Sequence, residues 1–146
     1  MKRIQRAKDK EEIITILMDE RLGVFKEIWR LLLFAAFVGL KNGRRESLKS
    51  SDPGKGIDQS TFGNSPAWPG LLYLIALVES QSSDSLSGSA AADDERVQLF
   101  QEYANGGLAI LKDFFSENNA DLDGMLAFID IQKGESAGEP DLDLMI

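Results

Sequence analysis

The chain has 146 residues, of which 16 are Lys or Arg and 24 are Asp or Glu, so its net charge is −8. This length is enough for one domain with a hydrophobic core. The sequence contains no Cys and no His, which excludes disulfides, zinc-thiolate sites, thiol nucleophiles and imidazole acid–base or metal chemistry. The carboxylates, amines, phenols and hydroxyls that remain indicate no particular reaction.

Two helices are predicted in the first forty residues. Asp9 can cap a helix that begins at Lys10, because acidic residues follow in the first turn and apolar residues recur at helical spacing up to Gly23. The second helix is expected over residues 24–40. After Arg30 it is apolar on nearly every side, which predicts a central helix that its neighbours cover.

A long irregular region follows. Residues 41–66 contain Gly, Ser, Asp, Pro and Lys with little periodicity, and a loop of this length is expected to be mobile, functional or ordered by a partner. Residues 66–80 are strongly apolar and predict a third helix with prolines in its first turn. Residues 81–92 are rich in Ser and lack bulky periodicity, which predicts a flexible linker.

The most regular apolar spacing comes next. After a cap at Asp93 or Asp94, apolar residues recur every three or four positions, which predicts a helix with one core-facing stripe. The stripe consists of Val97, Phe100, Ala104, Leu108, Leu111 and Phe115. Gly106 and Gly107 lie within it, although two glycines cost a helix about 2 kcal/mol relative to two alanines. We interpret them as a point of close packing or a kink, with a break between two helices as the alternative.

The last predicted helix covers residues 121–132. Residues 133–146 are acidic and predict a disordered, solvated tail, with a small apolar docking motif at its end as the alternative. That motif would comprise Leu142, Leu144, Met145 and Ile146. No stretch shows sustained alternation of apolar and polar residues. The sequence therefore predicts an all-α fold, a compact bundle of about five helices in a single domain, residues 1–132, with a long basic loop.

The charge is divided unevenly along the chain. Residues 1–55 hold 13 Lys or Arg against 8 Asp or Glu, whereas residues 56–146 hold 3 against 16. The two regions can attract different partners or each other. The basic residues cluster at the N-terminus and in the long loop, which suits DNA phosphates or acidic protein surfaces, or merely keeps the domain soluble. The candidate DNA- or partner-binding residues are Arg3, Arg6, Lys8, Lys41, Arg44 and Arg45.

Residues 119–130 partly match a calcium-binding loop, with oxygen donors at the first, third and fifth positions and Gly at the sixth. Asn119 and Asp130 depart from the pattern at its first and last positions, and no second loop exists to pair with it. We therefore expect a helix capped by Asp121, and neither a metal nor another cofactor. The longest apolar run, residues 31–38, is too short to span a bilayer. No membrane association and a cytoplasmic location are expected.

Several strings resemble one known family. They are RIQRAK at residues 3–8, Phe25, LFAA at 33–36 with Gly39, and FQEYANGGL at 100–108 followed by Ile110 and Leu111. Together they resemble the DNA phosphorothioation-associated protein 4 family over about residues 1–132, whereas residues 81–92 and the tail look individual to this chain. The matching motif residues are Glu102, Tyr103, Asn105, Gly106 and Gly107. The resemblance implies a small accessory protein of a Dnd system, which replaces a non-bridging phosphate oxygen of DNA by sulfur for defence, but it implies no chemical role for these residues.

Two functions from different classes remain. The first is a non-enzymatic accessory protein of a phosphorothioation-linked modification or restriction system, which binds duplex DNA or other proteins of the system. The alternative is a DNA-binding transcriptional regulator of ribbon-helix-helix type, because basic residues 2–6 precede a short helix, a Gly turn and a longer helix. A homodimer is left open. An enzyme is the least favoured interpretation, because the residue types leave few routes to catalysis.

Overall fold

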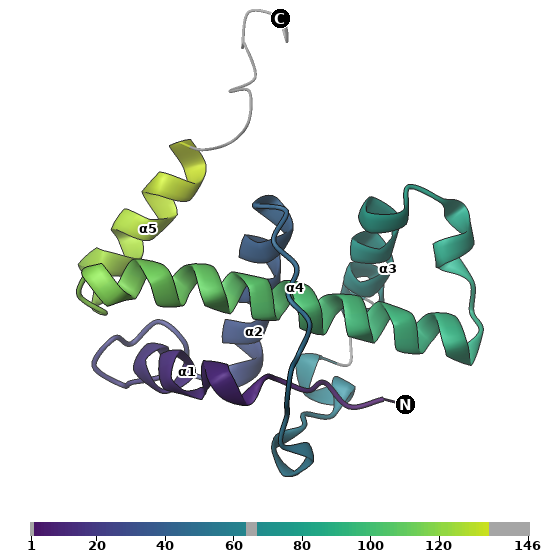
Figure 1. Ribbon diagram of the computed structural model, residues 1–146, viewed down its shortest axis with the longest axis horizontal. Helices are drawn as coiled ribbons and strands as arrows, with labels where there is room; N and C mark the ends of the chain where they lie inside the picture. Colours follow the sequence, from purple (N-terminus) through teal and green to yellow (C-terminus); the bar gives the residue numbers. More distant parts are fainter. Residues whose placement is uncertain (1, 64–66, 135–146) are drawn as a thin grey trace, which may run out of the picture.

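The computed structural model describes residues 2–63 and 67–134, and its regular structure is helical (Figure 1). The α-helices are α1 (Glu11–Leu17), α2 (Ile28–Lys41), α3 (Ala67–Ser80), α4 (Ala90–Glu117) and α5 (Leu122–Gly134). Short 3-10 helices join them: η1 (Lys8–Lys10), η2 (Pro53–Lys55), η3 (Gln59–Phe62) and η4 (Ser83–Leu86). Extended pairing within these residues is limited to isolated bridges, so the predicted all-α fold is confirmed.

The 28-residue helix α4 is the axis of the molecule. At 1.5 Å per residue it is about 42 Å long, and the other elements pack along it (Figure 1). Two aromatic clusters pack against it at different points along its length. One stacks Phe62 on Trp68 with ring centroids 4.3 Å apart. The other places Phe128 of α5 within 5.2 Å of Phe114, between ring centroids.

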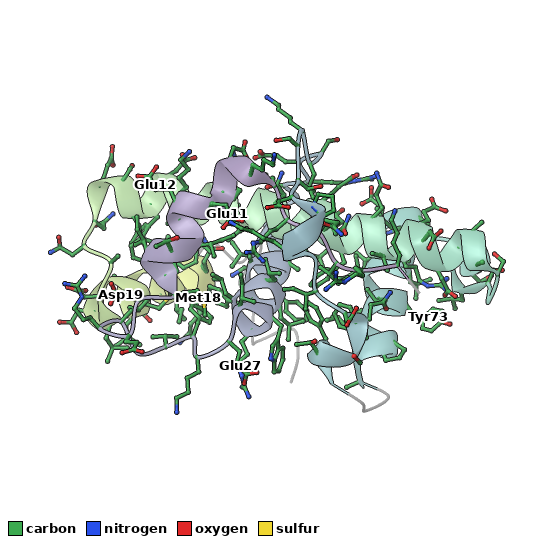
Figure 2. The ribbon with its side chains drawn as sticks, turned by 90° about the horizontal axis from the view of Figure 1, so that it is seen from below. Glu11, Glu12, Met18, Asp19, Glu27 and Tyr73 are labelled. Carbon is green, nitrogen blue, oxygen red and sulfur yellow. The ribbon has the colours of Figure 1, made fainter. Side chains whose placement is uncertain are left out.

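Three predictions for the first two helices are wrong: the cap at Asp9, the end of the first helix near Gly23, and the start of the second helix at residue 24. The first α-helix starts at Glu11 and stops at Leu17, and α2 starts at Ile28. Asp19, which is labelled in Figure 2, explains the early stop. Its carboxylate accepts a hydrogen bond from the Arg21 amide at 2.8 Å and so forms a turn.

Ser89 sets the start of α4. Its hydroxyl accepts from the Ala92 amide at 3.2 Å, so the predicted caps, Asp93 and Asp94, lie inside the helix. The helix begins within the predicted linker, residues 81–92, and η4 occupies another part of it. Ser is a preferred cap and the alanines that follow favour a helix, which accounts for the earlier start. The predicted tail starts at residue 133, but Lys133 and Gly134 belong to α5; the rest of it, residues 135–146, lies outside the described part of the chain.

The two adjacent glycines do not break α4. Helix α2 crosses α4 there, so closely that a Cβ on Gly107 would lie 1.7 Å from the carbonyl oxygen of Ala35. Likewise, a Cβ on Gly39 of α2 would lie 2.1 Å from the carbonyl oxygen of Tyr103 on α4. Any side chain at either position would overlap the opposing backbone. The interpretation of Gly106 and Gly107 as a point of close packing is therefore confirmed.

The other side of α4 is covered by an extended stretch of the long loop, residues 44–51, which we call the crossing segment (Figure 1). The N-terminal segment runs antiparallel to this loop. Ile4 and Ile57 exchange backbone hydrogen bonds of 2.8 and 2.9 Å, and the Lys8 amide donates to the Ser50 carbonyl at 2.9 Å. A ribbon-helix-helix dimer pairs this segment with that of a second chain, so its pairing within the chain argues against that alternative. In the described ranges, no helix is long and apolar enough to cross a membrane.

The crossing predicts a sharp difference between two glycine substitutions. Gly107→Ala should lower the free energy of unfolding by about 1–3 kcal/mol, because the added methyl group overlaps the α2 backbone. Gly70→Ala in α3 is the matched control, because a Cβ at this position would meet nothing within 4 Å. It should leave stability unchanged or raise it by up to about 1 kcal/mol. Urea unfolding curves measure both, and equal effects would contradict the close crossing.

Candidate functional site

The residues of the family motif lie where α4 is enclosed on all sides. Residues 99–109 of α4 are all buried, with α2 on one side and the crossing segment on the other. Three polar side chains, those of Gln101, Glu102 and Asn105, are buried among them. A buried polar group is costly unless it is hydrogen-bonded, so their partners define what this region does.

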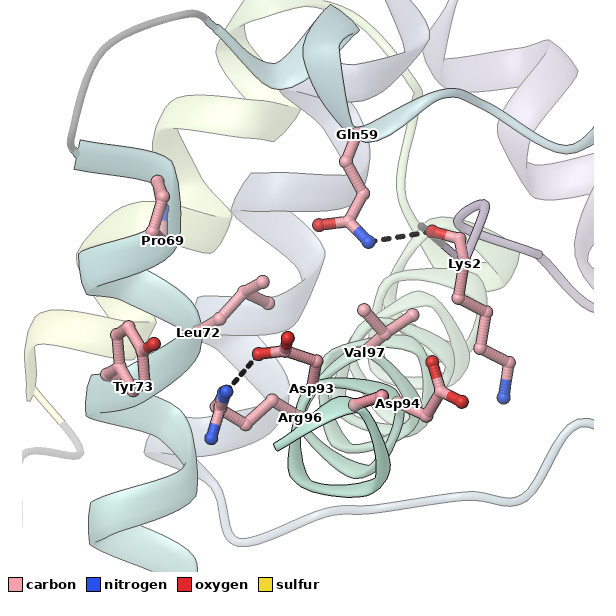
Figure 3. A pocket seen from close by; sticks show the side chains of 10 residues that line it. Lys2, Gln59, Pro69, Leu72, Tyr73, Asp93, Asp94, Arg96 and Val97 are labelled. Atoms are coloured by element: carbon pink, nitrogen blue, oxygen red, sulfur yellow. Dashed lines mark hydrogen bonds and ion pairs between the residues drawn. The ribbon is translucent and has the colours of Figure 1, made fainter. Parts of the chain in front are cut away.

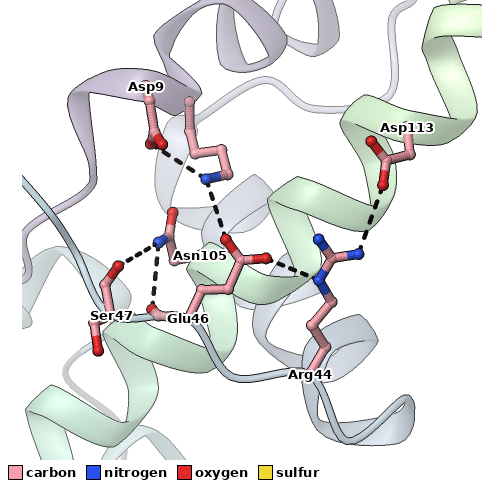
Figure 4. Close-up of polar contacts among 7 residues, drawn as sticks. Asp9, Arg44, Glu46, Ser47, Asn105 and Asp113 are labelled. Carbon is pink, nitrogen blue, oxygen red and sulfur yellow. Dashed lines mark hydrogen bonds and ion pairs between the residues drawn. The ribbon is translucent and has the colours of Figure 1, made fainter.

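Asn105 holds the crossing segment against α4. Its amide nitrogen donates to the carbonyl oxygens of Glu46 at 3.3 Å and Ser47 at 3.2 Å (Figure 4). The Glu46 amide in turn donates to the carbonyl oxygen of Glu102 at 3.1 Å. Gly106 permits this contact, because a Cβ there would lie 2.1 Å from the carbonyl oxygen of Arg44.

Gln101 holds the N-terminal segment against α4 in the same way. Its side-chain oxygen accepts from the backbone amide of Gln5 at 2.6 Å. Two adjacent extended segments are thus attached to one helix by its side-chain amides, together with the backbone bond between Glu46 and Glu102.

Glu102 carries a buried carboxylate that Arg45 of the crossing segment neutralises. The Arg45 Nε lies 2.5 Å from Glu102 Oε1, and its Nη1 lies 2.7 Å from Glu79 Oε1 on α3. Tyr103 completes the group by donating its hydroxyl proton to Glu79. The cluster therefore connects α3, α4 and the crossing segment through charge-assisted hydrogen bonds.

The surroundings shift the acidity of this cluster. Burial, reinforced by the hydrogen bond to Glu79, raises the pKa of Tyr103 to about 12. The hydrogen bond from Tyr103, followed by that from Arg45, holds the pKa of Glu79 below its ordinary value. The hydrogen bond to Glu102 raises the pKa of Arg45. All three groups thus keep their usual charge states at neutral pH, as befits a structural cluster.

A second network connects the crossing segment to the N-terminal region and to α4. Glu46 lies 2.8 Å from the Nε of Arg44 and 3.7 Å from the Nζ of Lys10, measured from its carboxylate oxygens (Figure 4). The Lys10 side chain is almost fully buried, and it also pairs with Asp9 at 3.2 Å. Arg44 reaches Asp113 of α4 at 3.6 Å.

Most of the predicted basic binding residues pair within the chain. Arg3 lies 3.1 Å from Asp58, and Arg6 lies 2.7 Å from Glu11, while Arg44 and Arg45 belong to the networks above. Lys8 and Lys41 are exposed, and neither forms an ion pair in the described part of the chain. The structure places Lys8 beside the loop and Lys41 at the C-terminal end of α2, so the six candidates do not form one site.

Sequence reasoning missed Lys10, Glu79 and Gln101 as site residues. The signal for Gln101 was present, because a polar residue within a stripe predicted to be buried requires a partner. Nothing in the sequence marks Lys10 or Glu79, whose partners lie on distant segments.

The predicted cap at Asp121 is confirmed, because its carboxylate accepts from the Gly124 amide at 2.7 Å. The described residues contain no group of three or more acidic side chains placed to hold a metal ion.

A cavity of about 560 Å³ lies between the N-terminal segment, α3 and α4 (Figure 3). Arg96 forms part of its wall. This side chain is buried, pairs with Asp93, donates to the Ser87 carbonyl at 2.9 Å and lies 4.2 Å from the centre of the Tyr73 ring. Its functional groups are engaged in holding the start of α4 against α3.

The fold and the site together define a small all-α protein in which buried polar residues bind two extended segments to a central helix. The chain belongs to the DNA sulphur modification system-associated protein 4 family, whose model matches residues 3–145. The resemblance is confirmed, but its limit at residue 132 is wrong, since the match includes the linker and nearly all of the tail. Among curated proteins and among solved structures, none matches this chain.

Tyr103 provides a test of the buried cluster. In a Tyr73→Phe variant it is the only tyrosine, and its phenolate absorbance at 295 nm should rise with a midpoint near pH 12. Stability from this group is fully present below pH 10 and is lost as pH rises through about 12, because the unfolded phenol ionises first. Adding Glu79→Gln should lower the midpoint, since a carboxylate partner favours the neutral phenol. A midpoint near 10 before this change would contradict the cluster.

Proposed function

We propose that this chain is a non-enzymatic accessory protein of a DNA sulphur modification system and that it acts by binding another protein of that system. The family's association with such a system supports the setting. The binding role is supported chiefly by one observation, the exposed apolar face of α3.

Helix α3 is apolar on two opposite faces. Leu72, Ile75 and Ala76 are buried in the core. On the opposite face, the exposed fractions are 50% for Leu74, 39% for Leu77 and 45% for Val78. Single exposed apolar residues are ordinary on protein surfaces, but Leu77 and Val78 follow Leu74 by three and four residues, so the three lie together on one side of the helix. Such a grouped apolar face is typical of a protein-binding surface.

The residue inventory supports a binding role over catalysis. The chain lacks His and Cys, the side chains that most often act as general bases and nucleophiles. The titratable groups Glu79, Glu102 and Tyr103 bond to one another or to Arg45. These bonds stabilise the fold.

Co-purification tests the α3 surface. The chain should bind at least one co-expressed protein of the system, and Leu74→Ser with Leu77→Ser should weaken that affinity at least tenfold, as expected for the centre of an interface. Leu126→Ser is the matched control, because Leu126 is 51% exposed on α5, at the other end of the molecule (Figure 1). Binding that depends on Leu126 and not on α3 would overturn the surface, and no binding to any protein of the system would overturn the function.

Direct DNA contact is a second candidate, favoured by the way the fold joins the two basic clusters. The bond between the Lys8 amide and the Ser50 carbonyl brings the N-terminal cluster against the loop cluster. Lys8 and Lys49 are both exposed on these neighbouring segments. Two exposed lysines of this kind suit adjacent phosphates, and they replace the paired arginines as the residues to test.

A salt series on duplex DNA measures this contact. If it exists, Lys8→Glu with Lys49→Glu should weaken binding and reduce the slope of log K against log salt by about one for each phosphate that the protein no longer neutralises. Lys26→Glu with Lys112→Glu changes the net charge equally at exposed positions elsewhere and should have a smaller effect. Equal weakening in both variants would indicate only non-specific attraction and would contradict a defined DNA surface.

A further inference from the structure

An apolar groove between α2 and α5 lies open beside the end of the described chain. Its volume is about 180 Å³, roughly six times the volume of a water molecule in the liquid. Phe37 in its wall is 44% exposed, which is unfavourable for so large an apolar side chain. The groove is lined chiefly by Phe34, Phe37, Val38 and Ile129, with Lys41 and Lys133 at one end.

Two contacts join the helices that form the groove. At one end, the side-chain nitrogen of Asn42 donates to Gln132 Oε1 at 2.7 Å. Deeper in the core, Phe34 lies against Phe128 with ring centroids 6.3 Å apart. The groove is thus bounded by two helices that contact one another at its end and at its base.

The charge beside the groove indicates what kind of segment can bind in it. Lys41 and Lys133 are exposed, and neither is paired with a carboxylate in the ranges that the structure describes. An apolar floor beside two such cations favours a segment in which apolar and acidic residues alternate closely.

The C-terminal segment of this chain has that composition. Residues 135–146 read ESAGEPDLDLMI, begin two positions after Lys133 and combine acids with a cluster of apolar residues at the end. We propose that residues 141–146 bind in the groove between α2 and α5 of the same molecule, with their aliphatic side chains against Phe37 and their carboxylates near the two lysines.

The lengths permit this contact. The groove extends along α2 from Phe34 to Lys41, about 10 Å at 1.5 Å per residue. Residues 135–140 can span up to about 20 Å when extended, and they include Gly138 and Pro140, which favour a reversal of chain direction. A tether this short gives an effective concentration of order millimolar, so weak contacts are enough to fill the groove.

The family match includes all but the last residue of this segment, since it extends to residue 145.

Paramagnetic NMR on the full chain tests the contact. Because the chain has no Cys, Asp143→Cys gives a single site for a nitroxide label. The amide signals of Phe37 and Val38 should weaken severalfold and recover when the label is reduced, whereas that of Leu77 on α3 should not change. Phe37→Ser should restore the signal of Val38 in the labelled protein. Leu126→Ser, an equally exposed change on α5 but outside the groove, should not.

Three results would overturn the proposal. The first is that only the amide signals of residues next to the tail in sequence weaken. The second is that the Val38 signal stays weakened in the Phe37→Ser variant, provided that this variant unfolds at the same temperature as its parent. The third uses a mixture of labelled, isotope-free chains with unlabelled, ¹⁵N-enriched chains. Weakened signals in that mixture would assign the groove to the tail of a second copy. None of these results depends on whether α3 binds a protein partner.

Discussion

Direct contact between the backbones of α2 and α4 is the constraint on which the rest of this structure depends. With Gly39 and Gly107 at the crossing, the carbonyl groups of each helix approach the position that a side chain would occupy on the other. The chain leaving α2 therefore starts beside α4, with Arg44 directly over Gly106. Only from there can the next residues reach Asn105 and Glu102. The family motif thus describes one packing arrangement in which each residue has a separate contact.

The fold also explains the uneven distribution of charge along the sequence. The sequence left open whether the basic and acidic regions attract separate partners or each other. Arg3, Arg44 and Arg45 each pair with acidic residues from the second region. Exposed pairs of this kind contribute little stability, but the partly buried pair of Arg45 with Glu102 removes an unpaired charge from the core. Many of the basic side chains that the sequence suggests for DNA binding are therefore paired with acidic residues of the same chain.

The sequence predicted what depends on local pattern. Apolar spacing located the helices and the core-facing stripe of α4, and the cost of two glycines in a helix indicated close packing before any partner was known. Helix ends were harder to predict from the sequence. Ser89 and Asp19 each determine an end by accepting a backbone hydrogen bond, and several neighbouring residues could do the same. The partners of the arginines could not be predicted, because Arg45 bonds to side chains 34 and 57 positions away in the sequence. Only the tertiary fold determines such pairs.

The enclosure of α4 has a consequence for the order in which this chain folds. Residues 99–109 of α4 are covered by elements that precede them in the sequence: the N-terminal segment, α2, the crossing segment and α3. During synthesis these elements emerge first, yet the helix that organises them is still inside the ribosome. The packing of α2 is therefore completed only after α4 has been synthesised, so the folding of the first half of the chain is coupled to the second half.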